Sequence, residues 1–289
     1  MNILIALDGS TNSEAFTGTL ANFPMTAETR IGLVVVHDQT LLSAHRINDL
    51  TSKLIIEKAQ AVIGNQYPDV SICSEIRSGP AAAQLLQACT SFEADVILAG
   101  AHSPRPFHKE LLGSIAAQIA KHADCSVRLV RPSSNGMRVL ACFDNTELDE
   151  SVLQEIMRLN WPPQSALRLM HVMEQPTEVF SYNPHEDARL FVDKQEHYKS
   201  EVTGFLNQFA DQIHSKFPDL DIDTFVSVEV ETVQEILDAA QKWSAGTLLI
   251  GSHRRIGLER FWLGSVSEPV AAKSICSVHI VRHNDDKNA

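Results

Sequence analysis

Cysteines are few in this sequence, and none of them belongs to a CxxC pair. The chain has five cysteines among 289 residues, so we expect reduced core thiols and no disulfide framework. The segment after Met1 lacks a basic region, a long apolar run and a small-residue cleavage site. No stretch approaches the roughly 20 apolar residues of a membrane helix. These absences predict a cytoplasmic protein that has no membrane partner.

Basic residues are also in deficit. Lys and Arg number 24 against 36 Asp and Glu, which gives a formal net charge of −12. This charge repels the phosphate backbone of nucleic acids, so we expect no nucleic-acid partner. The charged residues are scattered and 44% of the chain is hydrophobic, a composition that argues against disorder. At about 150 residues per domain, the length predicts two globular domains.

Familiar catalytic and nucleotide motifs are missing as well. The sequence has no GxxxxGK[ST] loop, no GxGxxG fingerprint and no GxSxG elbow. His102 and His108 share one segment without tight ligand spacing, and isolated histidines more often make hydrogen bonds than bind a metal. We therefore assign no catalytic residue and no metal site, and we do not expect a dedicated enzyme.

Short runs rich in valine and isoleucine alternate with stretches of helical periodicity. This pattern is typical of a parallel sheet that crossover helices bury on both faces. Strands are predicted near residues 2–8, 31–37, 70–77, 95–99 and 126–131, and again near 137–143, 166–172, 222–228, 247–250 and 278–281. The clearest helices are predicted at 50–63, 81–88 and 114–122. Each half is therefore predicted to be an α/β, doubly wound domain with a five-stranded parallel sheet flanked by helices.

The second half repeats the first with one difference in length. Gly100 and Gly251 both follow an apolar strand and are separated by 151 positions, whereas Asp8 and Asp144 are separated by 136. The second half therefore holds 15 extra residues between these landmarks. We place the extra residues in the segment 183–217, which has apolar residues at helical spacing.

A turn-rich stretch separates the two halves. Residues 132–136 read Pro-Ser-Ser-Asn-Gly, a composition typical of a linker. We therefore predict one domain at residues 1–133 and a second at residues 134–289.

An acidic residue follows the first strand of each half. Asp8 and Asp144 both close a predicted strand, and ligands of doubly wound sheets bind beyond the carboxyl ends of strands where the strand order reverses. A carboxylate there can accept hydrogen bonds from a ribose or hold a metal ion through its oxygens. The alternative is that Asp8-Gly9-Ser10 forms only a turn and a helix cap.

A second polar feature follows the fourth strand of the second half. Gly251 ends this strand, and Gly264 and Ser265 precede the next predicted helix. Glycines let the backbone approach an anion closely, while the N–H groups of a helix start and a serine hydroxyl can donate to phosphate oxygens. Glycine and serine before a helix are more often a simple cap. Their recurrence in the first half, at Gly113 and Ser114, favours the phosphate interpretation.

Residues 251–267 read GSHRRIGLERFWLGSVS and resemble the signature of the universal stress protein family, GxxG followed by nine residues and G[ST]. The resemblance covers both halves, so the chain looks like the tandem form of that family. It implies a strand order of 3-2-1-4-5 in each half and ATP or another adenine nucleotide at the switch point, with Mg²⁺ as a candidate companion ion. It also implies pairing of domains through their last strands, either within the chain or in a homodimer.

By this resemblance, the second half supplies the principal nucleotide site. The family pattern places Asp144 at the ribose and metal, Val172 at the adenine, and four residues at the phosphates, namely Gly251, Gly264, Ser265 and Ser267. Arg254 stands where the family has its second glycine. A Cβ at that position is unfavourable if the backbone needs a positive φ, but the guanidinium can itself bind phosphate.

The first half fits the family pattern less well. Its weaker site would consist of Asp8, Gly100, Ser103, Gly113 and Ser114. Ser103 replaces the second glycine, and two nearby prolines lack the N–H groups that a phosphate cradle needs.

An acidic residue also distinguishes the two halves at their second strands. We align Asp38, which follows His37, with Val172, which follows His171. This alignment puts a carboxylate where an adenine would pack in the first half, so we expect nucleotide to bind mainly in the second.

The leading prediction is a stress-response or regulatory protein that binds ATP mainly in its second half. A nucleotide-free tandem scaffold, or a protein that binds another small molecule, is the first alternative, because both halves have replaced the second glycine. A slow ATPase is the second alternative, although the sequence offers no general base poised on a phosphate.

Overall fold

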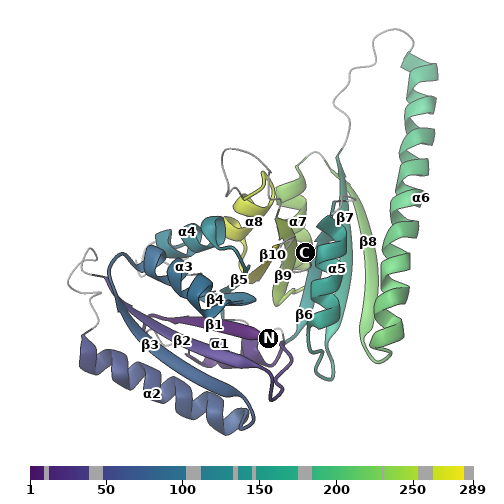
Figure 1. The fold of residues 1–289 in the computed structure, drawn as a ribbon. Helices are drawn as coiled ribbons and strands as arrows, with labels where there is room; N and C mark the ends of the chain where they lie inside the picture. The colour runs from purple at the N-terminus through teal and green to yellow at the C-terminus, as the bar shows by residue number, and fades with distance from the viewer. Residues whose placement is uncertain are drawn as a thin grey trace.

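In the part of the chain that the structure describes, ten strands form one continuous sheet (Figure 1). The computed structural model describes residues 1–9, 13–38, 48–101, 112–132, 136–144, 148–174, 184–229, 231–252 and 263–282. The first half contributes β1 (Asn2–Leu7), β2 (Arg30–His37), β3 (Ser71–Ser78), β4 (Val96–Gly100) and β5 (Ser126–Val130). The second half contributes β6 (Arg138–Phe143), β7 (Ala166–Glu174), β8 (Asp221–Glu229), β9 (Thr247–Ser252) and β10 (Ser277–Arg282). All ten predicted strands are confirmed.

The sheet joins the two halves edge to edge. Its order is β3-β2-β1-β4-β5-β10-β9-β6-β7-β8, so each half has the expected order 3-2-1-4-5. Neighbouring strands run parallel except β5 and β10, which are antiparallel with Arg128 opposite His279. The two predicted sheets are therefore parts of one ten-stranded sheet, and an approximate two-fold axis between β5 and β10 relates them.

Helices cover both faces of this sheet (Figure 1). One face packs on α1 (Ser13–Leu20), α2 (Asp49–Gln66), α5 (Leu148–Arg158) and α6 (Pro184–Lys216). The other face packs on α3 (Ala81–Phe92), α4 (Ser114–His122), α7 (Thr232–Lys242) and α8 (Ser267–Lys273). Strand side chains alternate between the faces, so the sheet separates two apolar cores. The helices predicted at 50–63, 81–88 and 114–122 are confirmed as α2, α3 and α4.

Local sequence explains where individual helices begin and end. The side chain of Asn48 accepts a hydrogen bond of 2.8 Å from the N–H of Thr51, which caps the start of α2. Glu93 ends α3 in the left-handed conformation, with φ of 51°, and its N–H donates to the last turn of the helix.

The extra length of the second half lies in α6, which has 33 residues against 18 in α2. Arg30 and Ala166 begin equivalent strands 136 positions apart, whereas their pairing partners Ser71 and Asp221 are 150 positions apart. Most of the insertion therefore falls between β7 and β8, which confirms that the segment 183–217 is lengthened. Figure 1 shows the N-terminal part of α6 extending beyond the carboxyl ends of the strands.

The predicted linker is described only at its ends. Pro132 and Gly136 are described, while residues 133–135 lie outside the described residues. The domain limits at 133 and 134 stay a prediction.

Candidate functional site

The strand order reverses beside the first strand of each half. β1 lies between β2 and β4, and β6 lies between β7 and β9. In the second half, α5 leads from β6 to β7 and α7 leads from β8 to β9, and these helices lie on opposite faces of the sheet. Ligands of doubly wound sheets bind at the carboxyl ends of strands at such switch points. Each half therefore has one candidate site, where β1 meets β4 or where β6 meets β9.

Asp144 lies directly at the switch point of the second half. It follows β6, its side chain is exposed, and its backbone N–H donates to Oδ1 of Asp149 at 3.0 Å. Asp149 is buried in the first turn of α5. Because Cys142 of β6 pairs with Ile250 of β9, Asp144 and Gly251 lie at neighbouring strand ends. The structure thus brings together two of the predicted site residues.

The predicted phosphate residues surround the start of α8. Gly264 is half-buried, and its N–H donates to the side-chain oxygen of Ser267 at 2.9 Å. Ser267 is buried as the first residue of α8, whereas Ser265 is exposed. Ser267 thus holds the helix start in this conformation, and Ser265 is the hydroxyl that an anion in solvent can reach.

Val172 and its neighbour His171 point to opposite faces of β7. Val172 is half-buried against the core beneath α7. His171 is buried on the other face, with Nδ1 3.0 Å from the carbonyl oxygen of Phe143, so Nδ1 carries the proton. Burial lowers the pKa of His171, although the Phe143 carbonyl and the Asp144 charge act in the opposite direction. The ring is therefore neutral near pH 7.

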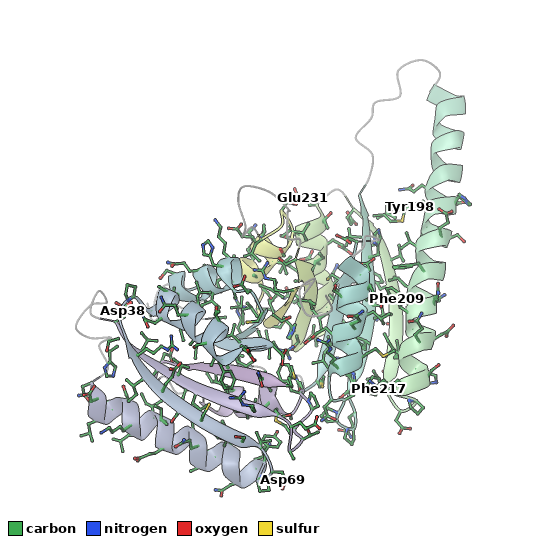
Figure 2. All side chains as sticks on the ribbon, viewed as in Figure 1. Asp38, Asp69, Tyr198, Phe209, Phe217 and Glu231 are labelled. Carbon is green, nitrogen blue, oxygen red and sulfur yellow. The ribbon has the colours of Figure 1, made fainter. Side chains whose placement is uncertain are left out.

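Two residues at the candidate site of the second half could not have been placed there from the sequence. Tyr198 lies on α6 (Figure 2). Its ring meets the His171 ring edge-on, with centroids 6.3 Å apart and planes at 75°. It is 40% exposed, so one side of the ring remains open to solvent. Asp149 is an acidic residue in a helix first turn, which is too common a feature to indicate its bond to Asp144.

The alignment of Asp38 with Val172 is wrong by two residues. Leu7 pairs with Val35 and Phe143 with His171, so the residue equivalent to Val172 is Val36. Aligning the two strands by their histidines, His37 and His171, gives the wrong register. Strand pairing decides which residues are equivalent, whatever their local similarity.

Asp38 has a different role from the one that the alignment implies. It is buried at the end of β2, and its Oδ2 accepts a hydrogen bond of 2.7 Å from the N–H of Ala81 (Figure 2). The carboxylate therefore caps the start of α3. It does not occupy the position where an adenine would pack, so this objection to a site in the first half is removed.

The first half nevertheless differs from the second at its phosphate residues. Asp8 is exposed after β1, and Gly100 is half-buried at the end of β4. Gly113 is buried, and its N–H donates to the carbonyl oxygen of Ala101 at 3.1 Å. Ser114 is exposed at the start of α4. The backbone itself therefore uses the Gly113 N–H group.

Several predicted residues lie outside the described residues. They are Arg254 in the second half, and Ser103, His102, His108 and the two prolines near Ser103 in the first. Within the described ranges, no group of three or more His, Cys, Asp or Glu residues is arranged to hold a metal ion. Across the same ranges, none of the helices combines the length and the apolar character needed to span a bilayer.

Similarity to known proteins extends over nearly the whole chain. The model of the universal stress protein family matches residues 1–131 and 137–282. Universal stress protein Sll1388 of Synechocystis sp. is 27% identical over 153 residues, which is 50% of this chain and 97% of that protein.

Solved structures share the complete two-half arrangement. A universal stress protein from Archaeoglobus fulgidus DSM 4304 matches with a TM-score of 0.61 at 19% identity, covering 99% of this chain and 97% of its own. A functionally unknown protein, PA1789 from Pseudomonas aeruginosa PAO1, matches with a TM-score of 0.67 at 15% identity, covering 98% and 93%. These likenesses show a common fold for both halves.

Proposed function

The chain belongs to the universal stress protein family, and from this premise we propose that it binds an adenine nucleotide in its second half, where β6 and β9 end. The observation that carries the proposal is the exposed Asp144 at the switch point beside Gly251, with Gly264 and Ser265 at the start of the following helix. The family resemblance assigns these same positions to the ribose and phosphates.

Asp144 suits the sugar end of a nucleotide. Its backbone is held by Asp149 through a hydrogen bond of 3.0 Å, while its own side chain is exposed at the strand end. Carboxylate oxygens accept hydrogen bonds from ribose hydroxyls and are also preferred ligands of Mg²⁺. ATP with Mg²⁺ is therefore the nucleotide form that we propose.

The start of α8 suits the phosphate end. Ser265 presents an exposed hydroxyl, and among the residues that the structure describes, only the Ser267 hydroxyl oxygen lies near the space where a Gly264 side chain would be, at 3.5 Å from an ideal Cβ. The Gly264 N–H donates to the side-chain oxygen of Ser267. A phosphate oxygen is a stronger acceptor than a hydroxyl, so we expect it to compete for this N–H group.

Val172 suits the base. It is half-buried at the edge of the apolar core formed with α7, next to partly buried Val233 and Phe225 in the same cluster. A flat apolar base gains by covering such surface. The equivalent residue in the first half, Val36, has the same chemistry, so the base position does not distinguish the halves.

Isothermal titration of the purified full chain with Mg²⁺-ATP tests the proposal, and we expect one nucleotide per chain. Asp144→Ala and Ser265→Glu should each weaken binding by about tenfold or more, because one charge-assisted hydrogen bond is worth about 1.5–3 kcal/mol. The matched controls are Asp8→Ala and Ser114→Glu, which change equivalent exposed residues of the first half and should leave the affinity within about twofold. Glu at either serine position favours the helix start, so the fold should survive.

Two results would contradict the proposal. The first is absence of binding to the unmodified chain in the titration and no rise of its melting temperature with Mg²⁺-ATP, since selective binding to the folded state must stabilise it. The second is equal loss of affinity in the variants of the two halves.

A nucleotide-free tandem scaffold is the second candidate function. It is favoured by the Gly113 N–H, which the Ala101 carbonyl already occupies, and by Ser103 and Arg254 at the position of the second glycine in both halves. Mass spectrometry of small molecules released from gently purified protein separates the candidates. Recovery of adenine nucleotide supports the first, and no released molecule together with no ATP-dependent stabilisation supports the second.

A further inference from the structure

The two halves meet where β5 pairs with β10, and we call this contact the seam. Val96 of β4 pairs with Ser126 of β5, and Thr247 of β9 pairs with Ser277 of β10. Each residue of β4 or β5 is therefore equivalent to the residue 151 positions later, in β9 or β10. Arg128 of β5 is therefore equivalent to His279 of β10, and these two residues face each other in the antiparallel register. The approximate two-fold axis passes through this pair.

The backbone bonds at the ends of the seam are reciprocal. The N–H of Arg131 donates to the side-chain oxygen of Ser277 at 3.0 Å, and the N–H of Arg282 donates to the side-chain oxygen of Ser126 at 3.2 Å. Each arginine is the equivalent of the other, and so is each serine. Both halves thus contribute the same pair of contacts.

The side chains of the two arginines repeat this reciprocity. Nη2 of Arg131 donates to the carbonyl oxygen of Ala271 at 3.0 Å, in α8 of the second half. The guanidinium of Arg282 donates to the carbonyl oxygen of Ala120, in α4 of the first half. Each half therefore caps the carboxyl end of a helix in the other. Two copies of the same half could make identical contacts, so the ends of the seam do not select a partner.

The centre of the seam is asymmetric. Arg128 and His279 are 1% and 0% exposed, and Glu155 of α5 places Oε1 3.0 Å from Nε2 of His279. The interval between β1 and β2 equals that between β6 and β7, so the equivalent of Glu155 in the first half is Thr19. Thr19 is buried as well, but it cannot carry a charge. The centre thus has one guanidinium, one imidazole and one carboxylate.

These groups balance in charge when unlike halves pair. Burial lowers the pKa of Arg128 to about 10, while Glu155 acts in the opposite direction, so the guanidinium stays charged at pH 7. Burial also lowers the pKa of His279, which leaves the imidazole neutral. Burial would raise the pKa of Glu155, but the contact with His279 and the nearby Arg158 and Arg128 outweigh it and the net pKa is lowered. One positive and one negative charge remain.

We propose that Arg128, Glu155 and His279 select a second half as the partner of the first half and reject another first half. Pairing β5 with β5 of a second chain would bring two buried Arg128 side chains together, with Thr19 in place of each carboxylate. Nε and Nη1 of Arg128 have no hydrogen-bond partner in the described structure, and the guanidinium lies 5.9 Å from the centre of the Phe23 ring, a contact that does not neutralise its charge. Uncompensated buried charge is strongly unfavourable, and such repulsion is a common source of partner specificity.

A refolding experiment on the full chain tests this selection. Equal amounts of isotopically light and heavy chain are unfolded in denaturant, mixed, refolded at chain concentrations near the roughly millimolar effective concentration of linked domains, and weighed by native mass spectrometry. For the unmodified chain, mixed light–heavy species should be limited to chains that exchange halves, in which each first half still pairs with a second half. The variant Arg128→His/Glu155→Thr has histidine at both 128 and 279 and threonine at both 19 and 155, so the two halves become identical at the centre of the seam. It should form at least about tenfold more mixed species, because removing one uncompensated buried charge shifts the equilibrium by that factor or more.

The matched control separates selection from stability. Ser126→Ala/Ser277→Ala removes one reciprocal bond from each half and weakens every pairing equally, so it should lower the melting temperature without raising the share of mixed species above that of the unmodified chain. If the first variant does not fold, Thr19→Glu/Glu155→Thr replaces it, since it keeps the same groups in the chain but gives each Arg128 a carboxylate in its own half. The proposal is overturned if the unmodified chain or the control forms as large a share of mixed species as a folded Arg128→His/Glu155→Thr or Thr19→Glu/Glu155→Thr chain.

Discussion

Replacing Glu155 with glutamine removes the carboxylate from the centre of the seam and leaves its shape nearly unchanged. Arg128 then keeps its charge at 1% exposure, with Nε and Nη1 still lacking hydrogen-bond partners. The recorded ion contact of Glu155 is with His279, and its charge acts on Arg128 through space; leaving such a buried charge uncompensated costs up to about 3–5 kcal/mol. The unfolding free energy of a domain is about 5–15 kcal/mol, so Glu155→Gln should remove a large part of it.

Thermal and urea unfolding, followed by circular dichroism, measure this loss. At about 2–4 °C per kcal/mol for chains of roughly this size, the melting temperature of Glu155→Gln should fall by roughly 6–20 °C. The midpoint of urea unfolding should fall as well, with little change in its slope, because the surface exposed on unfolding is the same.

The double variant Arg128→Met/Glu155→Leu checks that uncompensated charge is the cause. It removes both charges and keeps apolar volume, and such replacements of buried ion pairs are often neutral or stabilising. We expect it to be more stable than Glu155→Gln. A Glu155→Gln variant that loses less than about 1 kcal/mol, which is typical of an exposed pair, would refute the reasoning. So would a double variant that is less stable than either single change.

Three further predictions concern a helix cap, the buried histidines and the cysteines. Asp38→Ala should lower the unfolding free energy in urea by about 1–2 kcal/mol through loss of the α3 cap, and a loss below a few tenths would contradict that role. Burial lowers the pKa of both His171 and His279, so the unfolded chain binds more protons below about pH 6.5 and stability should fall as the pH drops from about 7 to 5. His279→Gln should flatten this dependence, and His197→Gln, whose side chain is 77% exposed, should not. Cys73 is exposed and the other four cysteines are buried, so one thiol per native chain should react rapidly with an aromatic disulfide reagent, and Cys73→Ser should abolish that reaction.

The strands could be predicted because turn residues mark where each strand begins and ends. Runs such as Val96-Ile97-Leu98-Ala99 are short, apolar and bounded by turns, so their position does not depend on knowing their neighbours. Because neighbouring residues within these strands are so similar, the sequence does not show how one strand aligns with the next. Val34, Val35 and Val36 are alike, and only the pairing of β2 with β1 shows that Val36, and not Asp38, matches Val172.

The candidate site could be predicted in part for the same reason. Asp144 and Gly251 end strands that the sequence marks, so their proximity follows from sheet order. The bond from the Gly264 N–H to Ser267 and the contact of Tyr198 with His171 depend on loop and helix geometry, which leaves no periodic trace in the sequence. The role of Asp38 as a helix cap was likewise visible only once α3 was placed beside β2.

The centre of the seam had one sequence signal, a charged or titratable residue in the middle of an apolar strand. Arg128 lies between Val127 and Leu129, and His279 lies between Val278 and Ile280. Only the antiparallel register shows that these two positions meet. Glu155 is contributed by a helix that precedes β10 by more than a hundred residues, so its place beside His279 could not be anticipated.

Fusion of the two halves explains how this centre can exist. When two identical subunits pair about a two-fold axis, each residue near the axis meets its own copy, so one charge on the axis becomes two like charges. A fused chain is free of that constraint, and Arg128 meets His279 while Glu155 corresponds to Thr19. The same freedom lets the two candidate sites differ, with the Gly113 N–H closed onto a backbone carbonyl and the Gly264 N–H held by a side chain that can move. An asymmetric seam maintains that difference, because it keeps each divergent first half paired with a second half.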